Sequence, residues 1–392
     1  MSEGVVDSKG SIIVLCLSIF AVMLGLGFIA PLLPLYAETL GASGFEVGLV
    51  FSSFAITRAL TMTPLGNLSD FWGRKIFIVL GTLLFSLASI LYVFAVNVQQ
   101  LILFRVLHGF ASALVIPAAM AYVADLFPES RRGEAMGVFN MAFFAGVGFG
   151  PLIGGVLAAK AGFYWPFYVC SLVAFTGFLL SLFRLKESKK PDFKKGKPKI
   201  SYGFGLLKDK NIFSVVFSRM TVAIGISSII AFLPLLTHEF GIGIMETGLL
   251  LTIQHSALIL SQKKFGKISD RYGRKYPMFL GCLIGAIALI FIGASRSFLS
   301  FLIILIIFGL SGGLTVPASS AAVADIAGRE KFGEAMGLFT TAISIGMTLG
   351  ATLGGLVADF FGLTNIFYLA AFLSFPGALI LLGFEEKEKG KP

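Results

Sequence analysis

The chain consists of long apolar runs separated by short polar breaks. Each run approaches the roughly 20 apolar residues that an α-helix needs to cross the hydrocarbon core of a bilayer. There are twelve such runs, at residues 11–37, 45–66, 76–96, 99–124, 133–159, 164–184, 211–237, 244–265, 276–295, 298–324, 334–358 and 363–384. This pattern predicts an all-α membrane protein with twelve transmembrane helices.

Composition supports a membrane protein and excludes several other classes. Hydrophobic residues make up 56% of the chain and charged residues only 13%, against about 25% charged in soluble domains. The three cysteines stand singly in apolar runs, without the spacing of a metal or redox site. With no nucleotide-binding loop, metal-ligand cluster or nucleophile-base pair in the sequence, we expect neither an enzyme nor a bound cofactor or metal.

The positive charges indicate the topology. Apart from Lys160 and Arg296, the basic residues of the breaks fall in every second break and in the tails, at 67–75, 125–132, 185–210, 263–275 and 325–333. Cytoplasmic loops carry such an excess of Lys and Arg. The net charge of +10 is therefore assigned to these loops and not to nucleic-acid binding. We expect a multi-pass protein of the cell membrane with both termini in the cytoplasm.

The chain repeats itself at a distance of 200 residues. Pro34 matches Pro234, Pro117 matches Pro317, and Val123-Ala-Asp125 matches Val323-Ala-Asp325. Six helices in each half leave both halves in the same orientation, as in transporters with parallel repeats. We therefore expect two six-helix bundles, 1–184 and 211–392, related by a pseudo-two-fold axis and joined by a basic cytoplasmic linker at 185–210.

A signature segment follows the second apolar run and recurs in the second half. It reads Gly66-Asn-Leu-Ser-Asp70-Phe-Trp-Gly73-Arg74-Lys75, and its repeat has Gly266, Asp270, Gly273, Arg274 and Lys275. Glycines permit a tight turn and close approach of helices. Asp70 is expected to precede the next span, where a carboxylate favours the positive helix terminus. A turn that only sets topology would explain the basic residues but not the repeated glycines and aspartate.

The signature segment resembles the cytoplasmic signature of the major facilitator superfamily. The resemblance implies a gating role for Gly66, Asp70, Gly73 and Arg74 and for the repeat residues Gly266, Asp270, Gly273 and Arg274. It also implies that Asp125 could pair with Arg74, and Asp325 with Arg274, as latches. An ordinary loop salt bridge is the simpler alternative for each pair.

The fifth apolar run carries a glycine-proline segment, Gly146-Val-Gly148-Phe-Gly150-Pro151-Leu-Ile-Gly154-Gly155. Glycines four residues apart make a smooth helix surface for close packing, and proline kinks a span. The segment resembles one typical of the superfamily's antiporters, and the second half has Ala351 in place of the proline. The first apolar run contains Gly27, Pro31 and Tyr36, and it resembles the glycine-proline run found in the drug:proton antiporter branch of the superfamily. Both features favour export by antiport.

Few basic, histidine or glutamine side chains lie within the apolar runs, and most candidates for a transport pathway are among them. A charge inside a span is costly and is expected to face a cavity or a partner. The candidates for the substrate and proton pathway are Arg58, Arg105, His108, His255, Gln262 and Tyr36. The repeat positions of the first two are Leu258 and Leu305, so the fold does not require an arginine there. Hydrogen bonding between helices is the alternative for these arginines and histidines.

No acidic residue lies in the middle of an apolar run. If protons are coupled to transport, the carrier is therefore His108, His255, or a carboxylate near a helix end such as Glu38 or Asp125. Histidine titrates near neutral pH and suits this task. Buried arginines would instead suit an anionic or neutral substrate.

These observations predict a secondary active transporter. We expect proton-coupled efflux of small amphipathic or drug-like compounds by alternating access, with protons as the coupling ion, the lipid bilayer as surroundings and a monomeric state. A uniporter or proton symporter for an anionic metabolite or a sugar is the alternative. A non-transporting receptor on the same fold would predict no inward-facing polar residues, yet Arg58, Arg105 and His255 are present.

Overall fold

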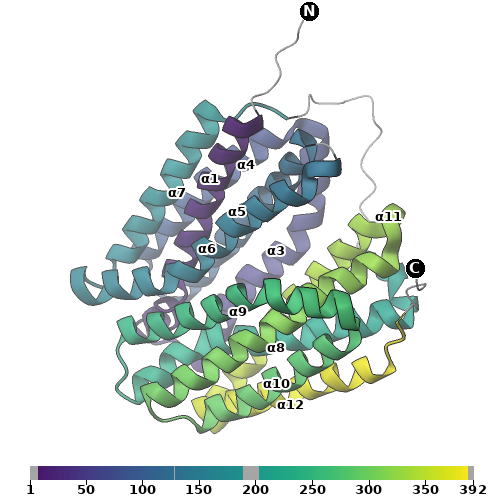
Figure 1. The fold of residues 1–392 in the computed structure, drawn as a ribbon. Coiled ribbons are helices and arrows are strands. Elements are labelled where there is room, and N and C mark those ends of the chain that lie inside the picture. Colours follow the sequence, from purple (N-terminus) through teal and green to yellow (C-terminus); the bar gives the residue numbers. More distant parts are fainter. Residues whose placement is uncertain (1–7, 128, 189–202, 387–392) are drawn as a thin grey trace, which may run out of the picture. The chain divides into compact units, whose positions relative to one another are not determined.

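The computed structural model describes residues 8–127, 129–188 and 203–386, and the regular elements in these residues are all helices (Figure 1). Most of the predicted linker, residues 189–202, lies outside the described residues, as do both tails.

The first half contains one broken and five continuous membrane-length helices. The first predicted span is divided into two helices. Helix α1 ends at Ile29, and α2 begins at Leu33 with Pro34 in the first turn of α2. Proline is tolerated there because the first N–H groups of a helix have no partner inside it. The elements are α1 (Ser8–Ile29), α2 (Leu33–Thr39), α3 (Gly44–Trp72), α4 (Arg74–Leu91), η1 (Tyr92–Phe94), α5 (Val98–Leu126), α6 (Glu129–Ala161) and α7 (Trp165–Arg184).

The second half repeats this order. Its elements are η2 (Phe204–Lys208), α8 (Lys210–Glu239), α9 (Ile244–Tyr272), α10 (Lys275–Ala294), α11 (Phe298–Phe361), α12 (Leu363–Leu379) and η3 (Ile380–Gly383). Helix α11 is interrupted at Gly328, whose φ of 64° is non-helical, and so supplies two spans. In the described part of the chain, twelve helices are long and apolar enough to cross a membrane. The prediction of twelve spans is confirmed.

The chain forms two compact units. Unit 1 comprises residues 1–41, 53–200 and 244–249, and unit 2 comprises residues 42–52, 201–243 and 250–392. In unit 1, α1 packs against α6 and α7, and α4 packs against α5 and α7. In unit 2, α8 packs against α11 and α12, and α10 packs against the same two helices. Each unit thus has a helical core of its own.

Candidate functional site

The signature segment is almost wholly helical. Helix α3 continues to Trp72, only Gly73 leaves the helix, with φ at 101°, and α4 begins at Arg74. A side chain at such a positive φ is strained, so glycine is the residue that ends the helix here. Asp70 precedes the next span as expected, but it lies in the last turn of α3 and not in the first turn of α4. The repeat at Gly273, with φ at 95°, has the same form.

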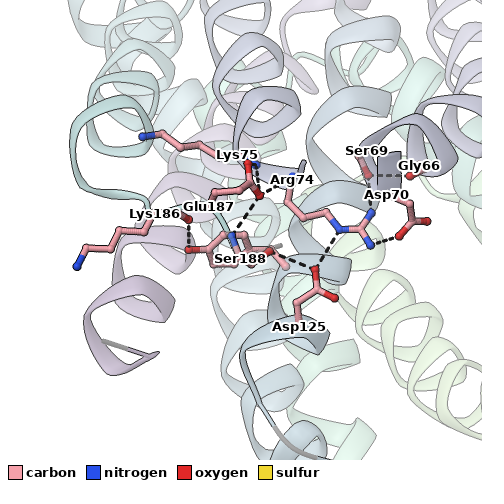
Figure 2. A network of polar contacts seen from close by, with 10 residues as sticks. Gly66, Ser69, Asp70, Arg74, Lys75, Asp125, Lys186, Glu187 and Ser188 are labelled. Carbon is pink, nitrogen blue, oxygen red and sulfur yellow. Dashed lines mark hydrogen bonds and ion pairs between the residues drawn. The ribbon is translucent and has the colours of Figure 1, made fainter. Parts of the chain in front are cut away.

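Arg74 is the centre of a polar network (Figure 2). Its Nε donates to Asp125 Oδ2 at 3.2 Å, its Nη1 donates to Ser69 Oγ at 2.7 Å, and its Nη2 pairs with Asp70. The Arg74 side chain is only 5% exposed. A buried charge is tolerated when it is paired and its remaining donors are satisfied. The ion pair expected between Arg74 and Asp125 is therefore present, inside unit 1.

The second half repeats the network in a more exposed form. Arg274 pairs with Asp270, its Nε donates to Asp325 Oδ2 at 3.3 Å, and its Nη1 donates to Ser269 Oγ at 3.2 Å. The Asp325 side chain is 57% exposed, against 23% for Asp125. Exposed ion pairs contribute little to stability. The first-half network is thus the stronger of the two.

Glu187 completes the first network and was missed by sequence reasoning. Its carboxylate accepts hydrogen bonds from the backbone N–H groups of Arg74, at 2.7 Å, and Lys75, at 3.1 Å (Figure 2). The first N–H groups of a helix lack partners and carry a partial positive charge, which a carboxylate satisfies. Ser188, the next residue, donates from its hydroxyl to Asp125 at 3.1 Å.

Glu386 occupies the equivalent place in unit 2. It accepts from the N–H of Lys275 at 2.6 Å, at the start of α10. The sequence held a signal for both residues, because Glu187 and Glu386 each follow the last helix of a half by a few residues. In both halves the segment that follows the last helix is therefore hydrogen-bonded to the signature turn.

The glycine-proline segment of α6 forms a close contact with α1 in unit 1. A β-carbon at Gly27 would lie 2.7 Å from Cα of Gly150, and one at Gly154 would lie 2.5 Å from the carbonyl oxygen of Phe28. Both distances are shorter than a β-carbon tolerates. The two helices therefore meet backbone to backbone, as small residues allow in membranes.

The other face of the same segment meets the first turns of α9, also within unit 1. A β-carbon at Gly155 would lie 2.7 Å from the carbonyl oxygen of Ile244, and one at Gly248 would overlap the carbonyl oxygen of Pro151. Unit 2 contains the repeat of this contact, in which Gly48 meets the carbonyl oxygen of Ala351. The close approach therefore depends on glycine at 48 and 248 and does not require the proline.

A buried aromatic and polar cluster in unit 1 contains three of the predicted pathway residues. The hydroxyl of Tyr92 bonds to Nδ1 of His108 at 2.8 Å, and Tyr36 donates to the carbonyl oxygen of Tyr92 at 3.0 Å. The guanidinium of Arg105 lies 4.4 Å from the ring centre of Phe54. His108 is fully buried, and its Nε2 has no hydrogen-bond partner in the structure. The cluster leaves one imidazole nitrogen available to a proton or a polar ligand.

The remaining predicted pathway residues lie on α3 and α9 and are not brought into this cluster. The Nε of Arg58 and the Nε2 of Gln262 are both buried, and neither has a hydrogen-bond partner in the structure. His255 bonds through Nδ1 to the carbonyl oxygen of Leu251 at 2.9 Å, one turn earlier on its own helix. Among the residues that the structure describes, there is no group of three or more His, Cys, Asp or Glu that could hold a metal.

Comparison with known proteins gives a consistent result. The sequence model of the Major Facilitator Superfamily matches residues 15–228 and 215–392. An uncharacterized MFS-type transporter of Methanocaldococcus jannaschii is 36% identical over 93% of this chain and 95% of its own length. Multidrug resistance protein 2 of Bacillus subtilis is 30% identical over 99% and 98%. A crystal structure of a bacterial homologue of the human lysosomal transporter Spinster covers 95% of this chain and 96% of its own, with a TM-score of 0.79 at 18% identity.

Proposed function

This chain belongs to the major facilitator superfamily and is a multi-pass membrane transporter, and on that basis we propose that it exports small amphipathic, drug-like compounds in exchange for protons. The halves 1–184 and 211–392, joined by the linker 185–210, act as the two parts of an alternating-access transporter. The protein works as a monomer in the cell membrane, with both termini in the cytoplasm.

The observation that carries the proposal is the glycine-proline segment of α6. Its glycines hold α6 in backbone contact with α1 and with the first turns of α9, so Gly150 and Gly154 have a structural reason to be glycine. The same segment resembles one typical of antiporters, which favours export over uptake. The resistance protein of Bacillus subtilis, similar over nearly the whole chain, supports the same direction.

The signature networks act as latches in this proposal. Arg74 with Asp125, and Arg274 with Asp325, each join the end of one helix to the start of another within a unit. A change in either pair alters how α4 and α5, or α10 and α11, are held together. Such pairs suit a transporter that must hold one state and then release it.

Proton coupling is assigned to a small set of groups. His108 has a free ring nitrogen beside Tyr92, and Asp125 accepts from Arg74 and Ser188. The other residues that we propose for the substrate and proton pathway are Arg58, Arg105, His255, Gln262 and Tyr36.

Everted membrane vesicles test the proposal. With an acidic interior reported by a pH-sensitive dye, lipophilic cations such as ethidium or tetraphenylphosphonium should dissipate the gradient and accumulate inside. Vesicles without the protein are the control. Substrate that leaves the vesicles together with protons would identify a symporter, and substrate movement without any change in the dye would identify a uniporter.

The alternative, transport of an anionic metabolite, is favoured by one observation. The Nε of Arg58 is buried without a hydrogen-bond partner, and a guanidinium binds carboxylates and phosphates well. A panel of organic anions in the same vesicles separates the two functions.

A further inference from the structure

Unit 2 encloses a cavity that is lined by residues of five helices. It lies among α8, α9, α10, α11 and α12 and has a volume of about 70 Å³. By the same measure one water molecule needs about 10–15 Å³. The cavity therefore has room for several water molecules or for one small ion with water. Half of the residues that line it are aliphatic or aromatic and three are glycines, and the polar side chains on it belong to Arg219, Gln254, His255, Cys282, Ser311 and Ser374.

Arg219 brings an uncompensated positive charge to this cavity. Its side chain is buried, and its Nε and Nη1 have no hydrogen-bond partner in the structure. The ring of Phe339 faces the guanidinium, and its centre lies 5.5 Å from the guanidinium carbon. None of the described residues that line the cavity is acidic. Arginine stays protonated in proteins, so the charge remains.

The other polar groups of the cavity do not supply a counter-charge. Ser311 donates its hydroxyl hydrogen to the carbonyl oxygen of Phe308 at 2.7 Å, and Ser374 donates to that of Ala370 at 2.7 Å. The thiol of Cys282 is only a weak acceptor. Water could satisfy the free N–H groups of Arg219, but it carries no charge to balance that of the guanidinium.

The fold itself does not require this arginine. The position 200 residues earlier in the repeat is Ile19, which is fully buried in α1. A bundle of this kind therefore packs well with an aliphatic residue at that place. A buried arginine with unused donors and an adjacent cavity is best explained by a ligand that is both small and negative.

We propose that unit 2 binds a small monovalent anion, of the size of chloride or acetate, in this cavity against the guanidinium of Arg219. The Nε–H and Nη1–H groups are the donors, and the side-chain amide of Gln254 adds a further N–H. The aliphatic walls exclude larger or multiply charged anions. The site is separate from the signature networks and goes beyond the proposed exchange of drug and proton.

Thermal unfolding of the purified protein in detergent tests the site. At constant ionic strength, replacing gluconate by chloride, bromide or acetate should raise the unfolding temperature with a saturating dependence on concentration. The shift should be lost in Arg219→Gln and kept in Arg184→Gln, which removes an exposed arginine at the end of α7. An equal shift in gluconate, or a shift that persists in Arg219→Gln, would overturn the proposal.

Direct binding gives a readout that does not depend on the folding of a variant. Radioactive chloride should bind the wild-type protein saturably, with one ion per chain and displacement by acetate but not by gluconate. Absence of saturable binding to the wild-type protein would also refute the site.

Discussion

Three arginines that lie inside the apolar runs have no arginine at the matching position of the other half. Arg58, Arg105 and Arg219 correspond to Leu258, Leu305 and Ile19. Leu305 and Ile19 are themselves fully buried, so an aliphatic side chain fills the same place without loss of packing. An arginine costs at least about 2.5 kcal/mol at the centre of a membrane helix. Each of the three is therefore better explained by what it binds than by what it packs against.

Substitution of the arginines by leucine should separate fold from function. We expect Arg105→Leu and Arg58→Leu to insert and to unfold within a few degrees of the wild-type temperature, but to lose most transport. Expression, unfolding temperature and drug accumulation in everted vesicles are the measurements, with Arg184→Leu as the exposed control. Normal transport, or degradation of the variants, would mean that these arginines only tie helices together.

Asp125 is the residue by which the latch is best tested. Asp125→Asn removes one of the two acids that pair with Arg74, while Asp70 remains to balance its charge. We expect transport to fall at least about tenfold, with expression nearly unchanged. Glu134→Gln is the matched control, because the pair of Arg131 and Glu134 is 59% and 70% exposed, and such pairs contribute little. Wild-type turnover in Asp125→Asn would show that the pair has no gating role.

At the scale of single helices, hydropathy located the spans but not their ends. The apolar pattern predicted a span at 45–66, yet α3 continues to Trp72, because a helix can extend into water as long as no residue breaks it. Gly73 ends it through its positive φ, and Gly328 breaks α11 in the same way. Asp70 therefore belongs to the last turn of α3, before the next span as predicted, and the predicted pairing of Arg74 with Asp125 is present.

Packing of α6 on α1 can be tested by one added methyl group. A β-carbon at Gly150 would lie 2.5 Å from Cα of Gly27, a backbone atom that cannot move aside. Gly150→Ala should therefore destabilise the protein by about 1–3 kcal/mol, the usual effect of overpacking, and lower the unfolding temperature. On the same helix nothing lies within 4 Å of a β-carbon at Gly137, so Gly137→Ala should be neutral or slightly stabilising. Equal effects of the two changes would contradict the packing role.

At the scale of the whole molecule, the repeat made most of the architecture predictable. The apolar runs identified the twelve spans, and the matched segments 200 residues apart identified the two halves and their signature turns. Contacts between residues far apart in the sequence were not predictable in the same way. The hydrogen bonds from Arg74 and Lys75 to Glu187 depend on how the chain leaves α7. The cavity at Arg219 depends on side chains from five helices, which no spacing in a single segment reveals.

The orientation of the protein in the membrane can be tested with two positions in unit 1. Lys186 is exposed and lies next to Glu187, which accepts a hydrogen bond at the start of α4. Val96 is 75% exposed and lies at the other end of this helix, just beyond η1, which continues α4. The two positions are therefore separated by the roughly 30 Å length of a 20-residue helix. In a variant whose three native cysteines are replaced, Val96→Cys should react with a membrane-impermeant maleimide in intact cells. Lys186→Cys should react only after permeabilisation, because the excess of Lys and Arg predicts that this end faces the cytoplasm. The opposite labelling pattern would place both termini outside the cell and invert the direction of the proposed transport.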